Sequence, residues 1–278
     1  MHLIYTQLDE FLQAALLEDI GTGDITTKHC VAENMNISGC FIAKESGVIC
    51  GLDIIARMFS LLDSSVTFVP NVADGDTVNE GSIIAAIRGP ARSILTGERT
   101  ALNLLQHLSA IATKTAESVK MVKGTKAKIL DTRKTIPGMR VLEKYAVKCG
   151  GGTNHRINLS DGVLIKDNHI KAAGGITKAV NAMRKNIPAD MKIEVETESL
   201  EDVKEALDAG ADIIMLDNMT INKMAEAVKL INSRALTEAS GNMGDRNLRE
   251  IAETGVDFIS IGALTHSVKA LDISLKFD

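Results

Sequence analysis

The first part of the chain combines amphipathic stretches with short apolar runs that turns separate. Leu8, Leu12 and Leu16 recur at helical spacing, and Gly21 follows where that helix is expected to end. Short runs bounded by turn residues, such as Asp74-Gly75-Asp76, predict strands. The expected elements are a helix over 8–20, strands over 37–43, 66–69 and 83–87, and helices over 52–62 and 91–122. This pattern predicts a small sheet with helices packed on it.

Beyond the long helix, short apolar strands alternate with helical patterns. The expected strands are 128–130, 163–165, 193–195, 213–216, 235–237 and 258–261. Near-continuously apolar strands with helices between them indicate a parallel sheet covered by helices. Polar or glycine residues follow these strands, and only a closed barrel brings all such strand ends to one mouth. We therefore expect an α/β barrel, incomplete because six strands replace the usual eight, and a last strand over 271–277 that returns to the N-terminal sheet.

Composition is that of a globular protein with a sizeable core. Hydrophobic residues make up 45% of the 278 residues, and no apolar run reaches the ~18 residues of a membrane span. The stretch from Met1 to Asp19 carries acidic residues and no small-residue cleavage pattern, so we expect no signal peptide. A cytoplasmic protein without a membrane partner is the resulting expectation.

The four cysteines do not form a recognisable motif. Cys30, Cys40, Cys50 and Cys149 show neither C-x-x-C spacing nor the density of a disulfide framework. Because cysteine is among the most often buried residue types, we expect buried thiols.

Positive charge is concentrated in one central stretch of an otherwise acidic chain. The formal net charge is -5 and the isoelectric point is near 5.7. A nucleic-acid-binding face would spread many cations over a surface, and aromatic residues for base stacking amount to only 3%, so no nucleic-acid partner is expected. The pattern instead indicates a pocket for a small, highly charged anion. The concentrated cations are Arg133, Lys134, His155, Arg156, Lys166 and His169.

Two carboxylates close later apolar runs and suggest a metal. Glu194 and Glu196 share one face of a strand by period-two alternation, and Glu196 lies nearer the expected mouth. Asp217 ends the next apolar run, where capping of a helix N-terminus is the alternative interpretation. Hard divalent cations prefer carboxylate and phosphate oxygens, so two acids beside many cations indicate phosphate, carboxylate and metal together.

Glycine-containing loops deliver several of these side chains. Gly150-Gly151-Gly152 permits backbone conformations closed to other residues just before Asn154-His155-Arg156. Ser240-Gly241-Asn242 and Gly262-Ala263 end the last two barrel strands before helices, whose first N–H groups suit a phosphate. Lys166 follows a strand and leaves three interpretations open: a partly buried nucleophile, a phosphate ligand, or a surface lysine whose stem covers apolar groups.

Taken together, these motifs resemble those of the quinolinate phosphoribosyltransferase family, also called decarboxylating nicotinate-nucleotide pyrophosphorylases, over essentially the whole chain. The family often has a second glycine where this chain has Asn242. The matching stretches are Glu18-Asp19 to Gly23-Asp24-Ile25-Thr26-Thr27, Glu98-Arg99-Thr100-Ala101-Leu102-Asn103, Asp131-Thr132-Arg133-Lys134-Thr135, Glu143-Lys144-Tyr145-Ala146-Val147, Gly150-Gly151-Gly152 with Asn154-His155-Arg156, Leu164-Ile165-Lys166-Asp167-Asn168-His169, Met215-Leu216-Asp217-Asn218 and Gly262-Ala263-Leu264-Thr265-His266-Ser267.

The resemblance implies an organisation and an activity. It implies an N-terminal α/β sandwich domain over 1–110 and an incomplete, six-stranded α/β barrel over 111–278, in a homodimer or a higher oligomer. It also implies a pentosyltransferase that converts quinolinate and phosphoribosyl pyrophosphate, with magnesium, to nicotinate mononucleotide, pyrophosphate and carbon dioxide in NAD biosynthesis.

Site roles carried over from the resemblance fall into three groups. Arg133, His155 and Arg156 hold the quinolinate carboxylates, with Arg99 reaching in from the neighbouring subunit. The residues expected to act catalytically on phosphoribosyl pyrophosphate, its ribose and magnesium are Lys134, Lys166, Glu196 and Asp217. The remaining residues expected to bind substrate, chiefly its 5′-phosphate, are Thr132, Ser240, Gly241, Asn242, Ile261, Gly262 and Ala263.

Three alternatives remain at this point. A relative of the same fold associated with molybdenum transport would have a different substrate, and an assay for nicotinate mononucleotide distinguishes it. A Schiff-base aldolase would use Lys166 as nucleophile, and borohydride trapping with a carbonyl substrate would reveal it. A non-catalytic anion-binding module is disfavoured because both acids and all the cations are present.

Overall fold

The computed structural model describes residues 2–277, with side chains from Leu8 onward, and separates the chain into two compact units. The first comprises Met1–Lys114, Cys149–Gly151 and Val268–Asp278, and the second comprises Thr115–Lys148 and Gly152–Ser267. The outermost positions of the predicted domains, Met1 and Asp278, lie outside the described residues. The domain boundary at residue 110 stays a prediction.

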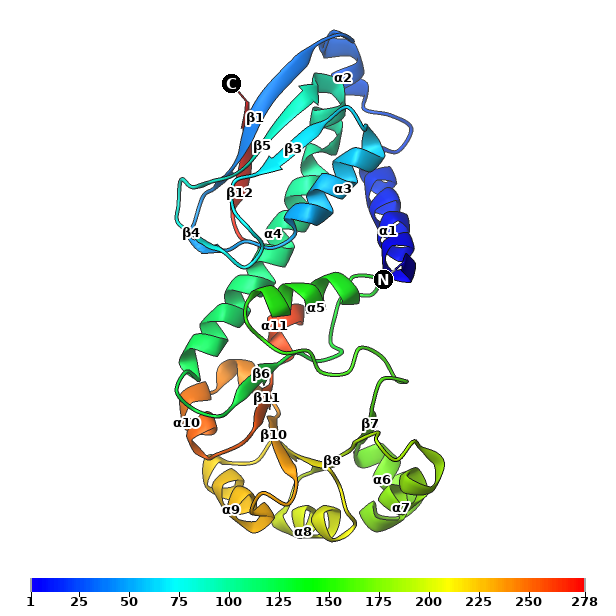
Figure 1. Cartoon of the computed structure of the whole chain (residues 1–278), viewed down its shortest axis with the longest axis vertical. Coiled ribbons are helices and arrows are strands. Elements are labelled where there is room, and N and C mark those ends of the chain that lie inside the picture. The colour runs from blue at the N-terminus through cyan, green and yellow to red at the C-terminus, as the bar shows by residue number, and fades with distance from the viewer. Residues whose placement is uncertain (1, 278) are drawn as a thin grey trace. The chain divides into compact units, whose positions relative to one another are not determined.

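An antiparallel sheet forms the centre of the first unit, with strand order β12-β1-β5-β3 (Figure 1). Its strands are β1 (Asn36–Ala43), β3 (Thr67–Pro70), β5 (Ile83–Pro90) and β12 (Ile273–Phe277). Gly39, Phe41 and Ala43 are buried while the residues between them are not, so one face of β1 packs inward. A short pair that the sequence pattern did not indicate, β2 (Gly47–Val48) with β4 (Thr77–Val78), lies in the connections.

Helices cover this sheet, as the periodic pattern predicts. Gly21 has φ +55° just after α1, the left-handed conformation that commonly ends a helix. The long helix α4 approaches α3 closely at Gly97, where a Cβ atom would lie 2.8 Å from the Phe59 ring. A larger residue at position 97 would push these two helices apart. The helices that begin in this unit are α1 (His2–Ile20), α2 (Ile25–Cys30), α3 (Leu52–Leu62) and α4 (Ala91–Met121).

In the second unit, the described residues contain a parallel sheet of six strands in the order β6-β11-β10-β9-β8-β7, which confirms the predicted fold class. The sheet curves with its helices on the outer side (Figure 1). Within the described residues β6 and β7 are edges that do not pair with each other, so the barrel is incomplete. The strands are β6 (Lys128–Leu130), β7 (Val163–Ile165), β8 (Ile193–Thr197), β9 (Ile213–Asp217), β10 (Leu236–Ser240) and β11 (Phe258–Ser260).

Three of these strands extend further than their apolar runs. Parallel pairing continues to the end of β9 and β10, where Asp217 lies in register with Ser240. Glu196 likewise lies within β8, opposite Met215 of β9. The candidate site residues at these positions are therefore held by the sheet itself. The helices of this unit are α5 (Arg140–Cys149), whose last residue belongs to the first unit, α6 (Asp167–Ala173), α7 (Ile176–Asn186), α8 (Leu200–Asp208), α9 (Ile221–Ile231), the 3₁₀ helix η1 (Met243–Asp245), α10 (Leu248–Glu253) and α11 (Ala263–His266).

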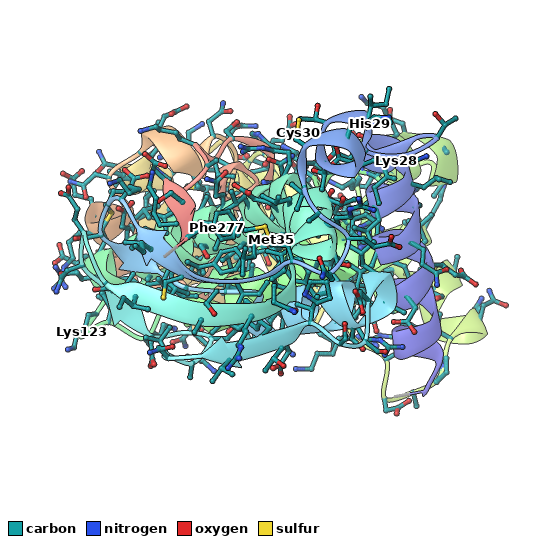
Figure 2. All side chains as sticks on the ribbon, turned by 90° about the horizontal axis from the view of Figure 1, so that it is seen from above. Lys28, His29, Cys30, Met35, Lys123 and Phe277 are labelled. Atoms are coloured by element: carbon teal, nitrogen blue, oxygen red, sulfur yellow. The ribbon has the colours of Figure 1, made fainter. Side chains whose placement is uncertain are left out.

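Burial of the cysteines differs from the prediction. Cys50 is buried, but Cys40 and Cys149 are half-buried and Cys30 is exposed at the outer end of α2 (Figure 2). The expectation of burial was wrong for Cys30 because this residue ends α2, a six-residue surface helix that has no apolar periodicity. Among the described residues, no helix has both the length and the apolar character needed to cross a membrane.

Candidate active site

A cavity of about 550 Å³ opens at the carboxyl ends of the parallel strands. Of the sequence-predicted residues, Ile261 is not among those that line it, and its side chain is packed in the core. Arg99 is exposed on α4, in the first unit. The structure therefore gathers most of the predicted residues at one place. The predicted residues that do line the cavity are Thr132, Arg133, Lys134, His155, Arg156, Lys166, Glu196, Asp217, Ser240, Gly241, Asn242, Gly262 and Ala263.

His169, the sixth cation of the central stretch, has a different role. Its Nδ1 accepts a hydrogen bond from the backbone N–H of Lys166 at 2.9 Å. Because α6 begins immediately after Lys166, His169 falls at the third helical position, where a side chain can cap the helix start. The sequence interpretation of His169 as part of the anion pocket is therefore wrong.

Asp131, at the end of β6, fixes the loop that carries two of the cations. Its Oδ1 accepts from Lys144 Nζ at 2.5 Å and from the His155 backbone N–H at 2.8 Å, and its Oδ2 accepts from Asn154 Nδ2 at 2.6 Å. Lys144 Nζ also donates to the His155 carbonyl at 2.9 Å. Burial raises the pKa of Asp131 and lowers the pKa of Lys144, while their ion pair opposes both shifts. The pair thus holds the 154–156 loop against the barrel.

Loss of Lys144 should destabilise the fold strongly. Lys144→Met would leave the fully buried Asp131 carboxylate without its cation, which costs about 3–5 kcal/mol of unfolding free energy. Urea denaturation of the variant measures this loss, with Lys148→Met, an exposed lysine of the same helix, as the matched control. Equal midpoints for the two variants would contradict the assignment.

His155 sits in a cluster of two carboxylates that sequence reasoning largely missed. Its Nε2 lies 3.0 Å from Glu194 Oε2 and 3.5 Å from Glu238 Oε2, while the Arg156 backbone N–H points to its Nδ1 at 2.8 Å. Burial disfavours the imidazolium, but the hydrogen bonds and charges of the two carboxylates outweigh it and raise the pKa of His155 to about 10. Because Nδ1 accepts from the Arg156 N–H, the proton that meets the two carboxylates lies on Nε2, and these contacts fix the ring where His155 lines the cavity.

The pKa of Glu194 rises to about 7 in the same cluster. Burial is the main cause and the charge of Glu238 adds to it, while the hydrogen bond with His155 acts in the opposite direction. Glu238 was detectable in principle, because it lies two residues before Ser240 on the same face of β10. Its polar side chain instead interrupted the apolar pattern and hid the second half of the strand.

Two guanidinium groups face the cavity close to one another. Burial, and then the positive charge of Arg133, lower the pKa of Arg156, while Glu194 opposes the shift. Arg156 donates to the Gly162 carbonyl at 3.0 Å. Arg133 Nε is buried and has no hydrogen-bond partner among the described residues. Adjacent like charges and an unmatched buried donor both favour an anionic ligand at this place.

Lys166, which directly follows β7, forms an ion pair with Glu196 of the neighbouring strand β8. Lys166 Nζ lies 2.7 Å from Glu196 Oε2, and 47% of the lysine side chain is exposed against 11% for the glutamate. A Schiff-base nucleophile must be a neutral amine, usually in a desolvated pocket. An exposed, ion-paired ammonium argues against the aldolase alternative and leaves Lys166 as a cation at the mouth.

Asp217 does not cap a helix. Helix α9 is capped by Thr220, whose hydroxyl accepts from the Lys223 backbone N–H. Asp217 instead lines the cavity, and its Oδ2 accepts from Asn218 Nδ2 at 2.6 Å. The capping interpretation is therefore wrong, and the carboxylate lies at the mouth as the metal interpretation requires.

The loop after β10 has backbone conformations that restrict its residues. Gly241 has φ +91°, and a Cβ atom there would lie 2.2 Å from Asn218 Oδ1, so only glycine fits. Asn242 has φ +52°, a left-handed conformation that asparagine tolerates better than most residues. Replacement of the family's second glycine by asparagine thus preserves the loop. Gly262 lets Lys134 approach, because a Cβ atom would lie 2.9 Å from Lys134 Cδ.

An α/β barrel whose mouth combines clustered cations with carboxylates and strand-end glycine loops defines a barrel enzyme acting on phosphorylated, anionic substrates. Two family models cover the chain: "Quinolinate phosphoribosyl transferase, N-terminal domain" matches residues 24–109, and "Quinolinate phosphoribosyl transferase, C-terminal domain" matches residues 111–276. The chain belongs to the quinolinate phosphoribosyltransferase family.

Individual relatives match over nearly the full length. A Bacillus subtilis protein named probable nicotinate-nucleotide pyrophosphorylase (carboxylating) is 46% identical, covering 98% of this chain and 93% of the relative. A Synechocystis protein of the same name is 48% identical, with 97% and 92% covered. The solved structure of the nicotinate-nucleotide pyrophosphorylase from Francisella tularensis superposes with a TM-score of 0.94 at 42% identity, covering 98% of this chain and 96% of that one.

Proposed function

We propose that this chain transfers the phosphoribosyl group of phosphoribosyl pyrophosphate to quinolinate, releasing pyrophosphate and carbon dioxide and forming nicotinate mononucleotide for NAD biosynthesis. The observation that carries the proposal is the pair of neighbouring guanidinium groups, Arg133 and Arg156, at one cavity with an unmatched buried Nε. Quinolinate carries two carboxylates, and guanidinium forks bind carboxylates in a bidentate manner. Family membership supplies the substrate class.

Lys134 and Lys166 would hold the pyrophosphate end of the second substrate. Both are exposed at the mouth and line the same cavity, so flexible ammonium groups can follow a polyanion. The glycine loops at Gly241 and Gly262 would admit the 5′-phosphate, since neither position has a side chain to obstruct it. Breaking the bond from ribose to pyrophosphate develops positive charge on the sugar, which the carboxylates of Glu196 and Asp217 would stabilise.

Magnesium fits the donor set of this site. Glu196 and Asp217 offer carboxylate oxygens at the mouth, and Mg²⁺ is typically bound by one or two protein carboxylates together with substrate phosphates. When bound, the ion would neutralise charge on the departing pyrophosphate. The 2.7 Å ion pair between Glu196 and Lys166 would then loosen, which frees the lysine for the phosphates.

Decarboxylation would follow from the same placement. Once the ring nitrogen is ribosylated it carries positive charge and can accept the electrons released when the neighbouring carboxylate leaves. The chain therefore needs to orient the ring and bind both carboxylates, and no further cofactor is required for this step. Arg133, His155 and Arg156 would supply that orientation.

We also propose a homodimer in which Arg99 of one subunit completes the active site of the other. Arg99 is exposed on α4 and belongs to the first unit. An exposed arginine suits binding of a carboxylate from outside its own unit.

Activity is expected to require a divalent metal. Excess chelator should abolish turnover, and Glu196→Gln or Asp217→Asn should raise the magnesium concentration for half-maximal rate roughly tenfold or more, because each loses a charged contact of ~1.5–3 kcal/mol. Steady-state assays across magnesium concentrations measure this, with Glu201→Gln, an exposed acid of α8, as control. Turnover in chelator would contradict the metal, and unchanged magnesium dependence would place the acids elsewhere.

One turnover assay tests the proposal as a whole. The purified chain is incubated with quinolinate, phosphoribosyl pyrophosphate and magnesium, and nicotinate mononucleotide and carbon dioxide are measured together. Equal amounts of both products are expected. Absence of nicotinate mononucleotide would favour the molybdenum-associated alternative, and borohydride trapping on Lys166 with a carbonyl substrate would favour the aldolase.

A further inference from the structure

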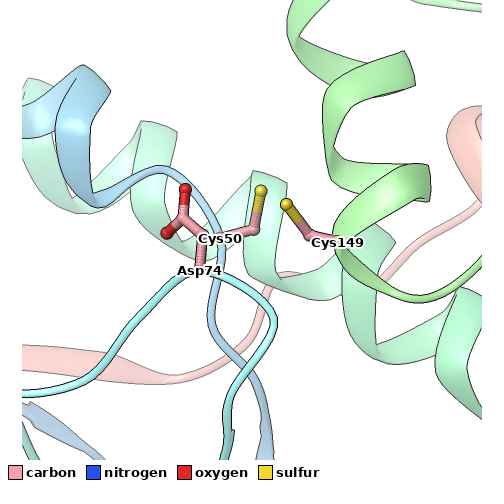
Figure 3. Close-up of side chains that lie close together, drawn as sticks. All are labelled: Cys50, Asp74 and Cys149. Carbon is pink, nitrogen blue, oxygen red and sulfur yellow. The ribbon is translucent and has the colours of Figure 1, made fainter.

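Three groups able to bind a metal meet in the first unit, in residues that the proposed activity does not use. Cys50 lies between β2 and α3, Asp74 lies between β3 and β4, and Cys149 is the last residue of α5. Their two sulfur atoms and a carboxylate oxygen all lie within 4.8 Å of one another. Figure 3 shows the two thiols pointing toward each other, with the Asp74 carboxylate beside Cys50.

Hydrogen bonds hold two of these residues in place. Asp74 Oδ1 accepts from the backbone N–H groups of Gly51 at 2.9 Å and Leu52 at 3.0 Å, at the start of α3. The Cys50 backbone N–H donates to Ser109 Oγ of α4 at 3.0 Å. These bonds orient the ligand-bearing residues in the way that outer-shell hydrogen bonds orient metal ligands.

The surroundings of Cys50 oppose a reactive free thiol. The hydrogen bond with Cys149, burial and the charge of Asp74 all raise the pKa of the Cys50 thiol. A thiol that resists ionisation and is fully buried attacks disulfides and peroxides slowly, so these features oppose a redox role. The same carboxylate becomes an attractive third ligand once a divalent cation is present.

We propose that Cys50, Asp74 and Cys149 form a binding site for a borderline-soft divalent metal, of which Zn²⁺ is the representative. Zinc takes thiolate and carboxylate ligands in tetrahedral sites. Binding converts two thiols to thiolates with release of two protons, Asp74 supplies an oxygen, and water completes the fourth position. Because Cys149 is only half-buried, the ion can reach the site from solvent at this residue.

The geometry requires only a small adjustment. Zn–S bonds of about 2.3 Å in tetrahedral coordination place two sulfur atoms roughly 3.8 Å apart. The most separated ligand atoms here, at up to 4.8 Å, would therefore draw together by roughly 1 Å. The metal would tie the start of α3 to the turn at Asp74 and to the end of α5.

Metal binding to the full chain tests the proposal directly. Protein purified under reducing conditions is stripped with chelator and divided into two samples. One sample is dialysed against Zn²⁺ and analysed for bound metal, and the other, still free of metal, is titrated with Co²⁺ as a spectroscopic probe. The unsubstituted chain and Cys30→Ser, the exposed-thiol control, should show a thiolate-to-cobalt charge-transfer band. Oxygen ligands at the Glu196 and Asp217 site give no such band, so the two metal sites are distinguished.

Substitution of the ligands should remove that signal. Cys149→Ser is expected to lose at least nine-tenths of the band, and Asp74→Asn, which keeps an oxygen acceptor for α3, should weaken metal affinity roughly 10- to 100-fold. Zinc should also raise the Tm of the unsubstituted chain but not of Cys149→Ser. Cys50 is fully buried, so the argument relies on the Cys149 and Asp74 variants.

Three results would overturn the site. One is an absent thiolate-to-cobalt band in the unsubstituted chain, and another is an equal band in Cys149→Ser. The third is a Cys50–Cys149 disulfide that persists in the protein purified under reducing conditions and leaves no thiol for a metal. Each is independent of whether the chain converts quinolinate, because the site shares no residue with the proposed active site.

Discussion

Replacing Arg133 or Arg156 with alanine should abolish useful quinolinate binding while phosphoribosyl pyrophosphate still binds. Each change removes a carboxylate partner and leaves charge unpaired at a partly buried place, which costs about 2–5 kcal/mol, or roughly a 30- to 4,000-fold loss of affinity. Arg133 Nε is buried with no partner among the described residues, so the loss at this position should be large. Titration calorimetry with each substrate separately measures both affinities.

Two further variants make that test specific. Arg133→Lys keeps the charge but loses the planar guanidinium. Its affinity for quinolinate should therefore lie between that of the unsubstituted chain and that of Arg133→Ala. Arg249→Ala removes an exposed arginine whose partner Glu253 is one helical turn away, and should change quinolinate affinity by less than about fivefold. Unchanged quinolinate binding in both cavity variants would remove the carboxylate assignment.

Mixing two inactive variants should restore activity if Arg99 serves the neighbouring subunit. Arg99→Ala and Arg133→Ala are each expected to be inactive alone. In a mixed dimer one site has both arginines and the other has neither, and random reassortment makes about half the dimers mixed, so roughly a quarter of the sites should recover. The turnover assay, read before and after subunit exchange, measures the recovery.

Differently tagged chains provide the control for exchange. Co-purification of both tags establishes that mixed dimers exist in the assayed sample. If mixed dimers form and activity stays at the level of the single variants, Arg99 acts within its own chain or serves only the fold. Arg88→Ala, which removes an exposed arginine of β5, is the matched control for Arg99→Ala. This variant should be active without a second variant.

Apolar periodicity predicted the course of the fold because the strand cores are apolar. The six barrel strands were located from those cores, and the antiparallel first sheet from short alternating runs. Strand ends were less accurate, since Asp217 and Ser240 are polar and yet remain in the sheet. The β2 and β4 pair was missed because two-residue strands carry no period.

Site residues could be predicted from the sequence where a charged side chain directly follows an apolar strand segment. They were harder to predict where a residue's role depends on its tertiary contacts. Lys166 and Glu196 were identified because they end apolar runs, but their 2.7 Å ion pair depends on the pairing of β7 with β8. His169 was misassigned because nothing in its residue type separates a helix-start hydrogen bond from a ligand contact. Glu238 was missed because its polar side chain interrupts the apolar run that marks β10, although its spacing from Ser240 places both residues on one face of that strand.

The pairing of β12 with β1 bears on how the chain folds as it leaves the ribosome. Phe41 and Leu275 are register partners, so the first sheet is completed only after every residue of the second unit has been synthesised. Until then β1 presents an open edge with unpaired backbone groups, a known starting point for aggregation. The barrel, by contrast, can fold as soon as its own strands emerge. A fusion or deletion that disturbs β12 should therefore lower the yield of soluble protein before it alters catalysis.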